Sequence, residues 1–172
     1  AAHARYTASV ETLKRALPKT LKQHVIERAF LPNYLFSDQD LVITIGPDGL
    51  VVNTAKYLTT QWILAVNPDP QRVDGVLIPF GVEEAGEWVK RAVAGSVTLK
   101  RVTMAKATLN DGQSLYAFND LFIGPRTHIS ARYRIEYAGQ AEDHSSSGII
   151  VSTGAGSTGW LQSIVTGACR VA

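Results

Sequence analysis

The stretch from Gly148 to Trp160 has the residue types of a nucleotide-binding turn, because an apolar segment leads directly into small residues. Glycine has no Cβ, so backbone N–H groups in such a turn can meet a phosphate or a ribose, and the helix expected over Trp160 to Val165 would point its N-terminus at the anion. The alternative is an ordinary strand-to-helix turn, since many Gly-rich turns bind nothing. The turn contains three glycines and four hydroxyl residues: Gly154, Gly156 and Gly159, and Ser152, Thr153, Ser157 and Thr158.

A second turn with chemical potential follows the apolar run Leu41 to Ile45, which has the pattern of a strand buried on both faces. Asp48 lies in this turn, before a segment with helical spacing of apolar residues. Ligands bind at the carboxyl ends of strands in open parallel sheets, so this carboxylate could hold Mg²⁺ or orient an attacking hydroxyl. It could equally serve as the N-cap of the following helix.

The elements around these turns predict an α/β arrangement in the first part of the chain. A helix with one apolar stripe is expected from Tyr6 to Leu17, where Pro18 stops it, followed by a loop through Phe30 to Asn33. The runs Leu41 to Ile45 and Trp62 to Val66, with a helix between them, predict two parallel strands of one sheet. Asn67 and Asp69 follow the second strand, where they either line the same cleft or form a turn.

A change of period marks the second part, which is β-rich. After a helix over residues 82–93, strands are expected at 97–108, 113–118, 121–123, 129–137 and 149–152, with a hairpin turn at 110–112 and a flexible polar loop at 144–147. Asn119 and Asp120 interrupt two apolar stretches and must be solvated, form a turn or bind a ligand. We therefore expect an α/β domain over residues 1–95 and a β-rich domain over residues 96–172.

Composition limits the classes of function. The chain has 172 residues, a net charge of +2 and one cysteine, Cys169, which excludes an internal disulfide and is typical of a cytoplasmic protein. It contains no basic block for nucleic-acid binding and no apolar run or signal peptide for the membrane, so neither partner is expected. The clustered Arg126, Arg132 and Arg134 are either a solvated strand face or an anion-facing rim.

Taken together, the motifs resemble the NAD kinase family over Asp40 to about Gln162. Gly46-Pro47-Asp48-Gly49 matches the family's G-G-D-G turn, and Asn119-Asp120 matches its N-E pair. Ser147-Gly148, with the turn from Ser152 to Trp160, matches its D-G-x-x-x-S-T-x-x-G-S-T-A-Y run, and Asn67 begins an echo of its N-T-G turn. The resemblance implies a Rossmann-like parallel-sheet domain, then an all-β domain of the NAD kinase C-terminal type that is incomplete at its C-terminus here.

The resemblance also implies a reaction and roles for residues. A phosphoryl group would pass from ATP, or polyphosphate, to the 2′-hydroxyl of the adenosine ribose of NAD, with Mg²⁺ assisting. Asp48 would be catalytic, engaging the hydroxyl or Mg²⁺. The substrate and nucleotide would be bound by Gly46, Gly49, Asn67, Asn119, Asp120, Ser147, Thr153, Gly156, Ser157, Thr158 and Trp160. Family members commonly form homo-oligomers, so the same is expected here.

Several departures from the family pattern lie in the expected site itself. Pro47 replaces a glycine and removes an N–H donor, which would cost about 1.5–3 kcal/mol if that group bonded an anionic oxygen. Asp120 is shorter than the family's glutamate, and Ser147 replaces an aspartate. These changes leave two alternatives open: a catalytically silent nucleotide-binding module, or a kinase of the same superfamily that acts on a sugar or lipid hydroxyl.

Overall fold

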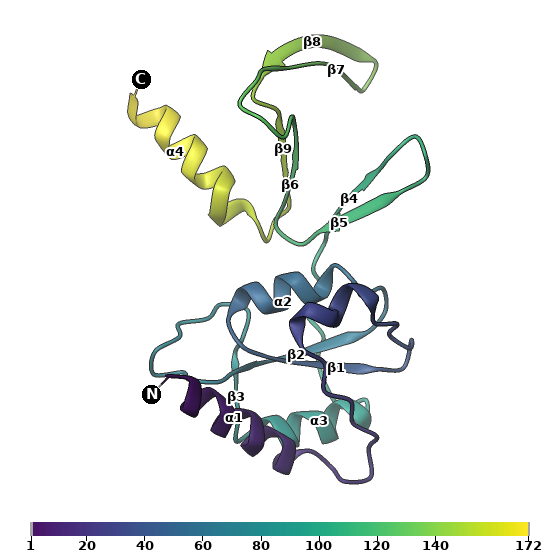
Figure 1. Cartoon of the computed structure of the whole chain (residues 1–172), viewed down its shortest axis with the longest axis vertical. Helices are drawn as coiled ribbons and strands as arrows, with labels where there is room; N and C mark the ends of the chain where they lie inside the picture. The colour runs from purple at the N-terminus through teal and green to yellow at the C-terminus, as the bar shows by residue number, and fades with distance from the viewer. Residues whose placement is uncertain (1, 172) are drawn as a thin grey trace. The chain divides into compact units, whose positions relative to one another are not determined.

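The structure is a computed structural model that describes residues 2–171 and the side chains of residues 3–170. The chain divides into two compact units, Ala1–Arg101 and Val102–Ala172 (Figure 1). Helices combine with a parallel three-stranded sheet in the first unit and with antiparallel strand pairs in the second. Mixed helix and strand content is therefore confirmed, and each unit is described by itself below.

The first unit is built on the parallel sheet β1-β2-β3, formed by Leu41–Ile45, Trp62–Asn67 and Phe80–Gly81. β1 and β2 pair in parallel from Leu41 opposite Trp62 to Ile45 opposite Val66, as the strand-helix-strand pattern predicted. Helix α1 (Ala2–Ala16) and α3 (Ala85–Val93) cover one face of the sheet, and α2 (Asp48–Ala55) covers the other (Figure 1).

Alternating side chains of β2 build two separate cores, one on each face of the sheet. Leu64 and Val66 point to α1 and α3 and pack in a cluster with Leu13, Val82, Ala85 and Val89. Ala65 points to the α2 side and packs with Val51 and Ile78. Burial on both faces is what makes a central strand of a parallel sheet continuously apolar.

Two expectations about the first unit are wrong. Only Thr44 of β1 is fully buried, because β1 is an edge strand that pairs with β2 alone. The segment expected as a loop through Phe30 to Asn33 is a short 3₁₀-helix, η1 (Arg28–Asn33), that buries Leu31. A single turn of this kind has too few residues to show a helical apolar period.

The second unit consists of three antiparallel strand pairs followed by a helix. β4 (Ala105–Thr108) and β5 (Ser114–Ala117) form the hairpin expected around residues 110–112. β6 (Asp120–Ile123) pairs with β9 (Ile149–Ser152), and the hairpin of β7 (Ala131–Tyr137) and β8 (Gln140–Ser146) lies between them in sequence. A short π-helix, η2 (Ser157–Leu161), which is kinked at Gly159, then leads into α4 (Gln162–Val171).

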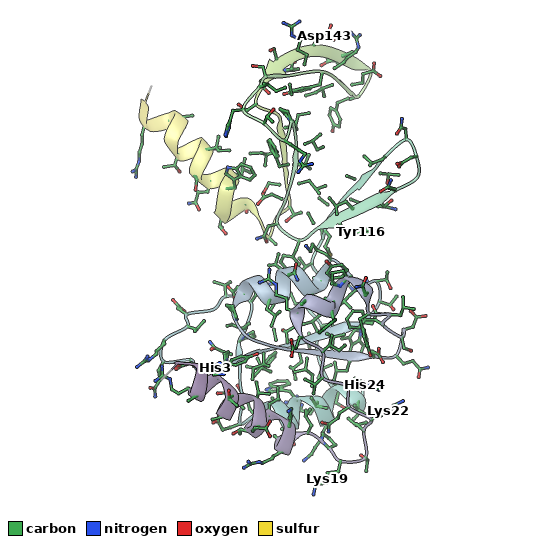
Figure 2. The ribbon with its side chains drawn as sticks, in the orientation of Figure 1. His3, Lys19, Lys22, His24, Tyr116 and Asp143 are labelled. Carbon is green, nitrogen blue, oxygen red and sulfur yellow. The ribbon has the colours of Figure 1, made fainter. Side chains whose placement is uncertain are left out.

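Two expectations about the second unit are also wrong. Residues 97–104 are not a strand, since no strand in the described part of the chain pairs with them, and regular β-structure begins at Ala105. His144 to Ser146 do not form a flexible loop but belong to β8, which pairs with β7 along its whole length. Strands that are largely exposed on both faces carry polar side chains, so composition alone makes them look like loops. Asp143 in β8 illustrates this exposure (Figure 2).

Candidate functional site

The GPDG turn lies at the carboxyl end of β1, where α2 begins. Pro47 is the N-cap residue, with an extended backbone, and Asp48 is the first residue of the helix. Gly46 is buried and its N–H donates to the carbonyl of Val66 at 3.2 Å, so this amide is used inside the sheet. Gly49 is exposed, and a Cβ added there would meet no atom within 4 Å. The turn is therefore open to solvent at Gly49 and closed at Gly46.

The Asp48 carboxylate does not cap its own helix, and that alternative is wrong. Its two oxygens accept hydrogen bonds from the consecutive backbone N–H groups of Val76 and Leu77, each at 3.1 Å. Val76 and Leu77 belong to the β2–β3 loop, which we define as residues 68–79. Sequence reasoning did not identify this loop as a partner of Asp48; the Asp74-Gly75 pair, a common turn signal, was the available indication.

Asn67, at the end of β2, organises the same loop. Its side-chain amide donates to the carbonyl of Val73 at 2.8 Å and accepts from the N–H of Asp69 at 3.0 Å, and the residue is 6% exposed. Asp69 also pairs with Arg5 of α1 at 3.2 Å. Asn67 thus lies at the expected edge of the sheet, with its polar groups turned into the loop.

Helix α1 contributes polar side chains to this edge, which sequence reasoning missed. Besides the Arg5 pair, Tyr6 donates its hydroxyl to the carbonyl of Ile45 at 3.3 Å, immediately before the GPDG turn, and Ser9 donates to the carbonyl of Pro68 at 2.8 Å. The N-terminal half of α1 is therefore fastened to the ends of β1 and β2. The apolar stripe gave no sign of these contacts, because Arg5 and Ser9 lie outside the stripe and the contact of Tyr6, its first residue, is made by the hydroxyl and not by the ring.

In the second unit, two of the predicted motifs come together. Asp120 pairs with Ser152 across β6 and β9, which places the Asn119-Asp120 pair beside the start of the Gly-rich turn. The N–H of Thr153 donates to the carbonyl of Asn119 at 2.9 Å, and the Thr153 hydroxyl donates to the carbonyl of Phe118 at 2.6 Å. The family's N-E and S-T-x-x-G motifs are thus one local structure here.

Gly156 allows this close contact. Its N–H donates to the Thr153 hydroxyl at 3.1 Å, and a Cβ at this position would lie 2.3 Å from the carbonyl oxygen and 2.8 Å from the Cα of Asn119. Real side chains do not approach a backbone so closely, so only glycine fits while the turn keeps this position. Three glycines, at positions 154, 156 and 159, were expected to open the turn to a ligand. Of these, Gly156 has a clear role in packing.

Asp120, next to Asn119, has one carboxylate oxygen whose hydrogen bonding is incomplete. Its Oδ1 atom is buried and accepts no hydrogen bond from any described residue. A buried carboxylate oxygen without a donor costs free energy, so native structures normally supply one, often from a ligand or water. In the turn after Gly156, Ser157 and Thr158 are exposed, and the Ser157 hydroxyl donates to the carbonyl of Gly154 at 2.8 Å.

Two other predicted residues of the second unit, Trp160 and Ser147, lie at different places. Trp160 is 48% exposed, and its ring packs against that of Phe122 with centroids 5.7 Å apart. Ser147 is exposed between β8 and β9, at the opposite end of the β6–β9 pair from Asp120 and Ser152. The second unit therefore brings together Asn119, Asp120, Thr153 and Gly156, but does not bring Ser147 to them.

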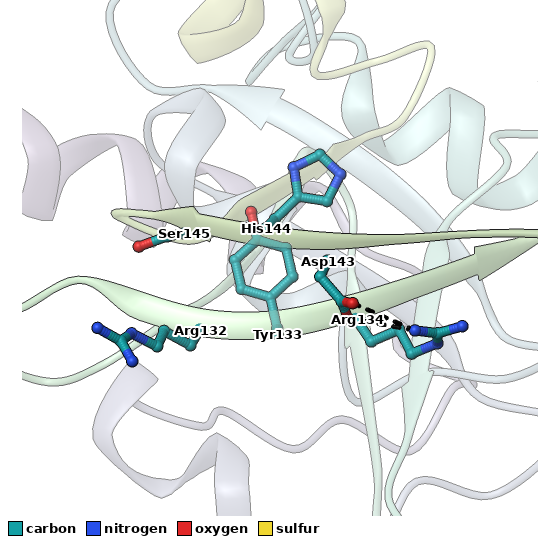
Figure 3. A pocket seen from close by; sticks show the side chains of 6 residues that line it. All are labelled: Arg132, Tyr133, Arg134, Asp143, His144 and Ser145. Carbon is teal, nitrogen blue, oxygen red and sulfur yellow. Dashed lines mark hydrogen bonds and ion pairs between the residues drawn. The ribbon is translucent and has the colours of Figure 1, made fainter.

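A separate surface pocket lies on the β7–β8 hairpin; it contains none of the predicted nucleotide-binding residues, but Arg132 and Arg134, two of the three clustered arginines, line it. Tyr133 and His144 stack across the two strands, with centroids 5.6 Å apart and planes 6° apart (Figure 3). Arg134 pairs with Asp143 at 3.3 Å, so its charge is partly neutralised on an exposed strand face. The lining residues are Arg132, Tyr133, Arg134, Asp143, His144 and Ser145.

The described residues give two further facts about binding. Residues 2–171 contain no cluster of three or more His, Cys, Asp or Glu side chains suited to a metal ion. Mg²⁺ prefers near-octahedral oxygen ligands and usually keeps waters and substrate phosphates, so Asp48 would supply a single protein ligand at most. Within the same residues, none of the helices combines the length and apolar character that a membrane span requires.

Comparison with known proteins gives the following relatives, while no protein-family profile matches the chain. The chain is 30% identical over 128 residues to an NAD kinase of Heliobacterium modesticaldum, which covers 70% of this chain and 44% of that kinase. It is 28% identical over 141 residues to NAD kinases of Porphyromonas gingivalis, which covers 76% of this chain and 48% of those kinases. The chain thus spans about half the length of the curated relatives it matches.

These findings first define a class: a kinase-like protein in which parallel α/β structure carries a GPDG turn and antiparallel strands join Asn119-Asp120 to a Gly-rich turn. More specifically, the chain is a divergent, NAD kinase-like family member. The resemblance that the motifs predicted is confirmed.

Proposed function

We propose that the chain is an NAD kinase-like phosphotransferase, which moves the γ-phosphoryl group of ATP, or a phosphoryl group of polyphosphate, to the 2′-hydroxyl of the adenosine ribose of NAD. The observation that carries the proposal is the unpartnered, buried Oδ1 of Asp120 beside Asn119 and the 153–156 turn. A ribose hydroxyl is a donor that would satisfy this oxygen. The similarity to NAD kinases supplies the class of reaction.

In the proposed reaction the acceptor hydroxyl oxygen forms a bond to the γ-phosphorus, the bond to the β–γ bridging oxygen breaks, and ADP leaves. The hydroxyl proton must pass to a base, for which the Asp48 carboxylate is our candidate. Asn119 and Asp120 would bind ribose hydroxyls, and Ser157, Thr158 and Trp160 would contact the nucleotide. Such transfer depends mainly on positioning and on neutralising phosphate charge.

Mg²⁺ would enter this reaction chiefly with the ATP phosphates, where it neutralises charge. The donor set supports no more than this, because the GPDG turn has one carboxylate and could supply only a single protein ligand to the metal. Action in the cytoplasm and assembly into a homo-oligomer remain predictions that accompany the proposal.

A second candidate function is a catalytically silent nucleotide-binding module. Two observations favour it: Pro47 has no N–H, and the N–H of Gly46 is bonded to Val66, so two amides of the turn cannot bind a phosphate. This module would be stabilised by the dinucleotide without turnover. At a ligand concentration of 100 times Kd the stabilisation is about 2.7 kcal/mol.

The two functions separate in one experiment that follows ADP release from Mg-ATP with a panel of acceptors: NAD, NADH, simple sugars and a lipid alcohol. We expect release with NAD, and a loss of about 10²- to 10⁴-fold in Asp48→Asn if the carboxylate takes the proton. ADP release that requires a sugar or a lipid alcohol in place of NAD would show that the protein is a different kinase of the same superfamily. Stabilisation by NAD without any release would establish the silent module and refute the kinase.

A further inference from the structure

We propose that the β2–β3 loop (residues 68–79) is a positioning clamp for Asp48, and that Asn67 is a positioning residue that acts through this loop and not a nucleotide ligand. The inference deepens the proposed function and rests on it for its catalytic meaning. Its geometric part, the clamp itself, depends only on contacts within the first unit.

The first observation is that each Asp48 oxygen has its own backbone donor. Oδ2 accepts from Val76 and Oδ1 accepts from Leu77, both at 3.1 Å. Because the two donors are consecutive in the chain, rotation of the carboxylate would break both bonds together. A carboxylate has about four acceptor positions, so roughly two remain for a hydroxyl or a cation. The clamp thus fixes the direction of the group without using it up.

The second observation is that the loop is itself fastened at both ends. At its start, Asn67 bonds the carbonyl of Val73 and the N–H of Asp69, which closes the first half of the loop around a buried side chain. At its end, Ile78 is 1% exposed and packs with Val51 of α2, the helix that carries Asp48. The donors to Asp48 therefore lie on a segment held between two buried anchors.

The third observation is the fit at Gly75. A Cβ at this position would lie 2.0 Å from Cγ1 of Ile78 and 3.0 Å from Oδ1 of Asp48. The loop passes so near the carboxylate that a larger residue would push it away from Asp48 or from Ile78. The position of the Asp48 carboxylate is thus fixed in three ways: by hydrogen bonds, by the buried Ile78 and by the steric fit at Gly75.

The chemical consequence follows from the sensitivity of phosphoryl transfer to alignment. A misplacement of about 1 Å in a catalytic group can cost on the order of 100-fold in rate. Loosening the loop should therefore lower kcat by about 10- to 100-fold and leave the KM for ATP nearly unchanged, since the hydrogen bonds lost are those to the proposed base, Asp48. If the loop had only a structural role, its variants would lower the free energy of unfolding without lowering kcat at an unchanged KM for ATP.

The test uses the full chain and two readouts. Amide hydrogen exchange measures the clamp directly: in Asp48→Ala the N–H groups of Val76 and Leu77 should exchange at least about 10-fold faster, as expected for losing a hydrogen bond to a charged group. Exchange at the wild-type rate would show that the clamp does not form. This readout requires no enzymatic activity.

Kinetics then measure the role of the clamp. Val76→Pro removes one donor, and Val76→Ala is its matched comparison because the Val76 side chain is 87% exposed. We expect kcat of the proline variant to be about 10- to 100-fold below that of the alanine variant, with equal KM for ATP. Should Val76→Pro not fold, Asn67→Ala should give the same kcat loss and faster exchange at both amides. Equal kcat in a folded Val76→Pro and in Val76→Ala, or wild-type kcat in Asn67→Ala, overturns the positioning role.

The outcomes also separate this inference from the proposed function. A wild-type protein that transfers phosphate to no acceptor, yet loses protection at Val76 and Leu77 in Asp48→Ala, refutes the kinase and the catalytic purpose of the clamp while its geometry stands. An active protein whose loop variants keep wild-type kcat refutes the clamp's role and leaves the kinase intact.

Discussion

Gly156→Ala tests how the second unit joins its two motifs. Gly156 has φ −81° and ψ −12°, which alanine adopts without strain, so the substitution changes only the space that the residue fills. The new Cβ would stand 2.3 Å from the carbonyl oxygen of Asn119. Because that neighbour is backbone, the turn must move away, and the bonds from Thr153 to Asn119 and from Gly156 to Thr153 must lengthen or break.

The expected size follows from those two hydrogen bonds. At about 0.5–1.5 kcal/mol each, their loss lowers the free energy of local opening by about 1–3 kcal/mol. The exchange of the Thr153 amide should then be about 5- to 150-fold faster than in the wild type. Hydrogen exchange is the suitable assay because it reports this turn and not the stability of the other unit.

Gly154→Ala is the matched control, since it adds the same methyl group to the same turn. A Cβ at Gly154 meets nothing within 4 Å, so the Thr153 amide should keep its wild-type exchange rate. If both variants exchange equally fast, the close contact with Asn119 is not what holds the turn, and the reasoning is refuted.

Three further predictions concern stability. In Gly86→Ala the new Cβ would lie 2.3 Å from the backbone oxygen of Ala16, so α3 must move from α1 and the first unit should lose about 1–3 kcal/mol in urea unfolding; an unchanged midpoint would contradict the contact. Thr153→Val should lose about 1–3 kcal/mol while Thr153→Ser loses less, because serine keeps the hydroxyl that bonds two backbone groups. The hydrogen bond with Lys14 lowers the pKa of Glu11 below its ordinary value of 4.5. The stability that Glu11 contributes is therefore present above pH 4.5 and is lost as the pH falls through the pKa of the folded state. The difference in melting temperature between wild type and Glu11→Gln should accordingly disappear on acidification.

The parallel core could be predicted because local and tertiary signals agree there. The run at Trp62 is apolar over five residues and the run at Leu41 has four apolar residues and Thr44; a helix-sized segment separates them, so the crossover rule leaves one arrangement. The β6–β9 pairing was not predictable in the same way, since it joins residues about 30 positions apart with the β7–β8 hairpin between them. Only the family resemblance related Asn119 to the Gly-rich turn.

The candidate site shows the same division. The residue type of Asp48 and its place after a strand indicated chemistry, but the partners of its carboxylate are backbone N–H groups, which have no sequence signature. Asn67 was predicted as a nucleotide ligand on its position at the strand end, a role that stays untested, and its actual hydrogen-bond partners lie within the following loop. Side-chain identity predicts what a residue can do, while the path of the loop decides which groups it meets.

The measurement that tests the account most directly is transfer of a labelled γ-phosphoryl group from ATP to NAD by the full chain, with the product identified by mass spectrometry. The account predicts labelled NADP in the wild type and a loss of about 10²- to 10⁴-fold in Asp48→Asn. Labelled NADP formed at equal rates by the two proteins, or folded wild-type protein that yields no labelled NADP, would contradict it.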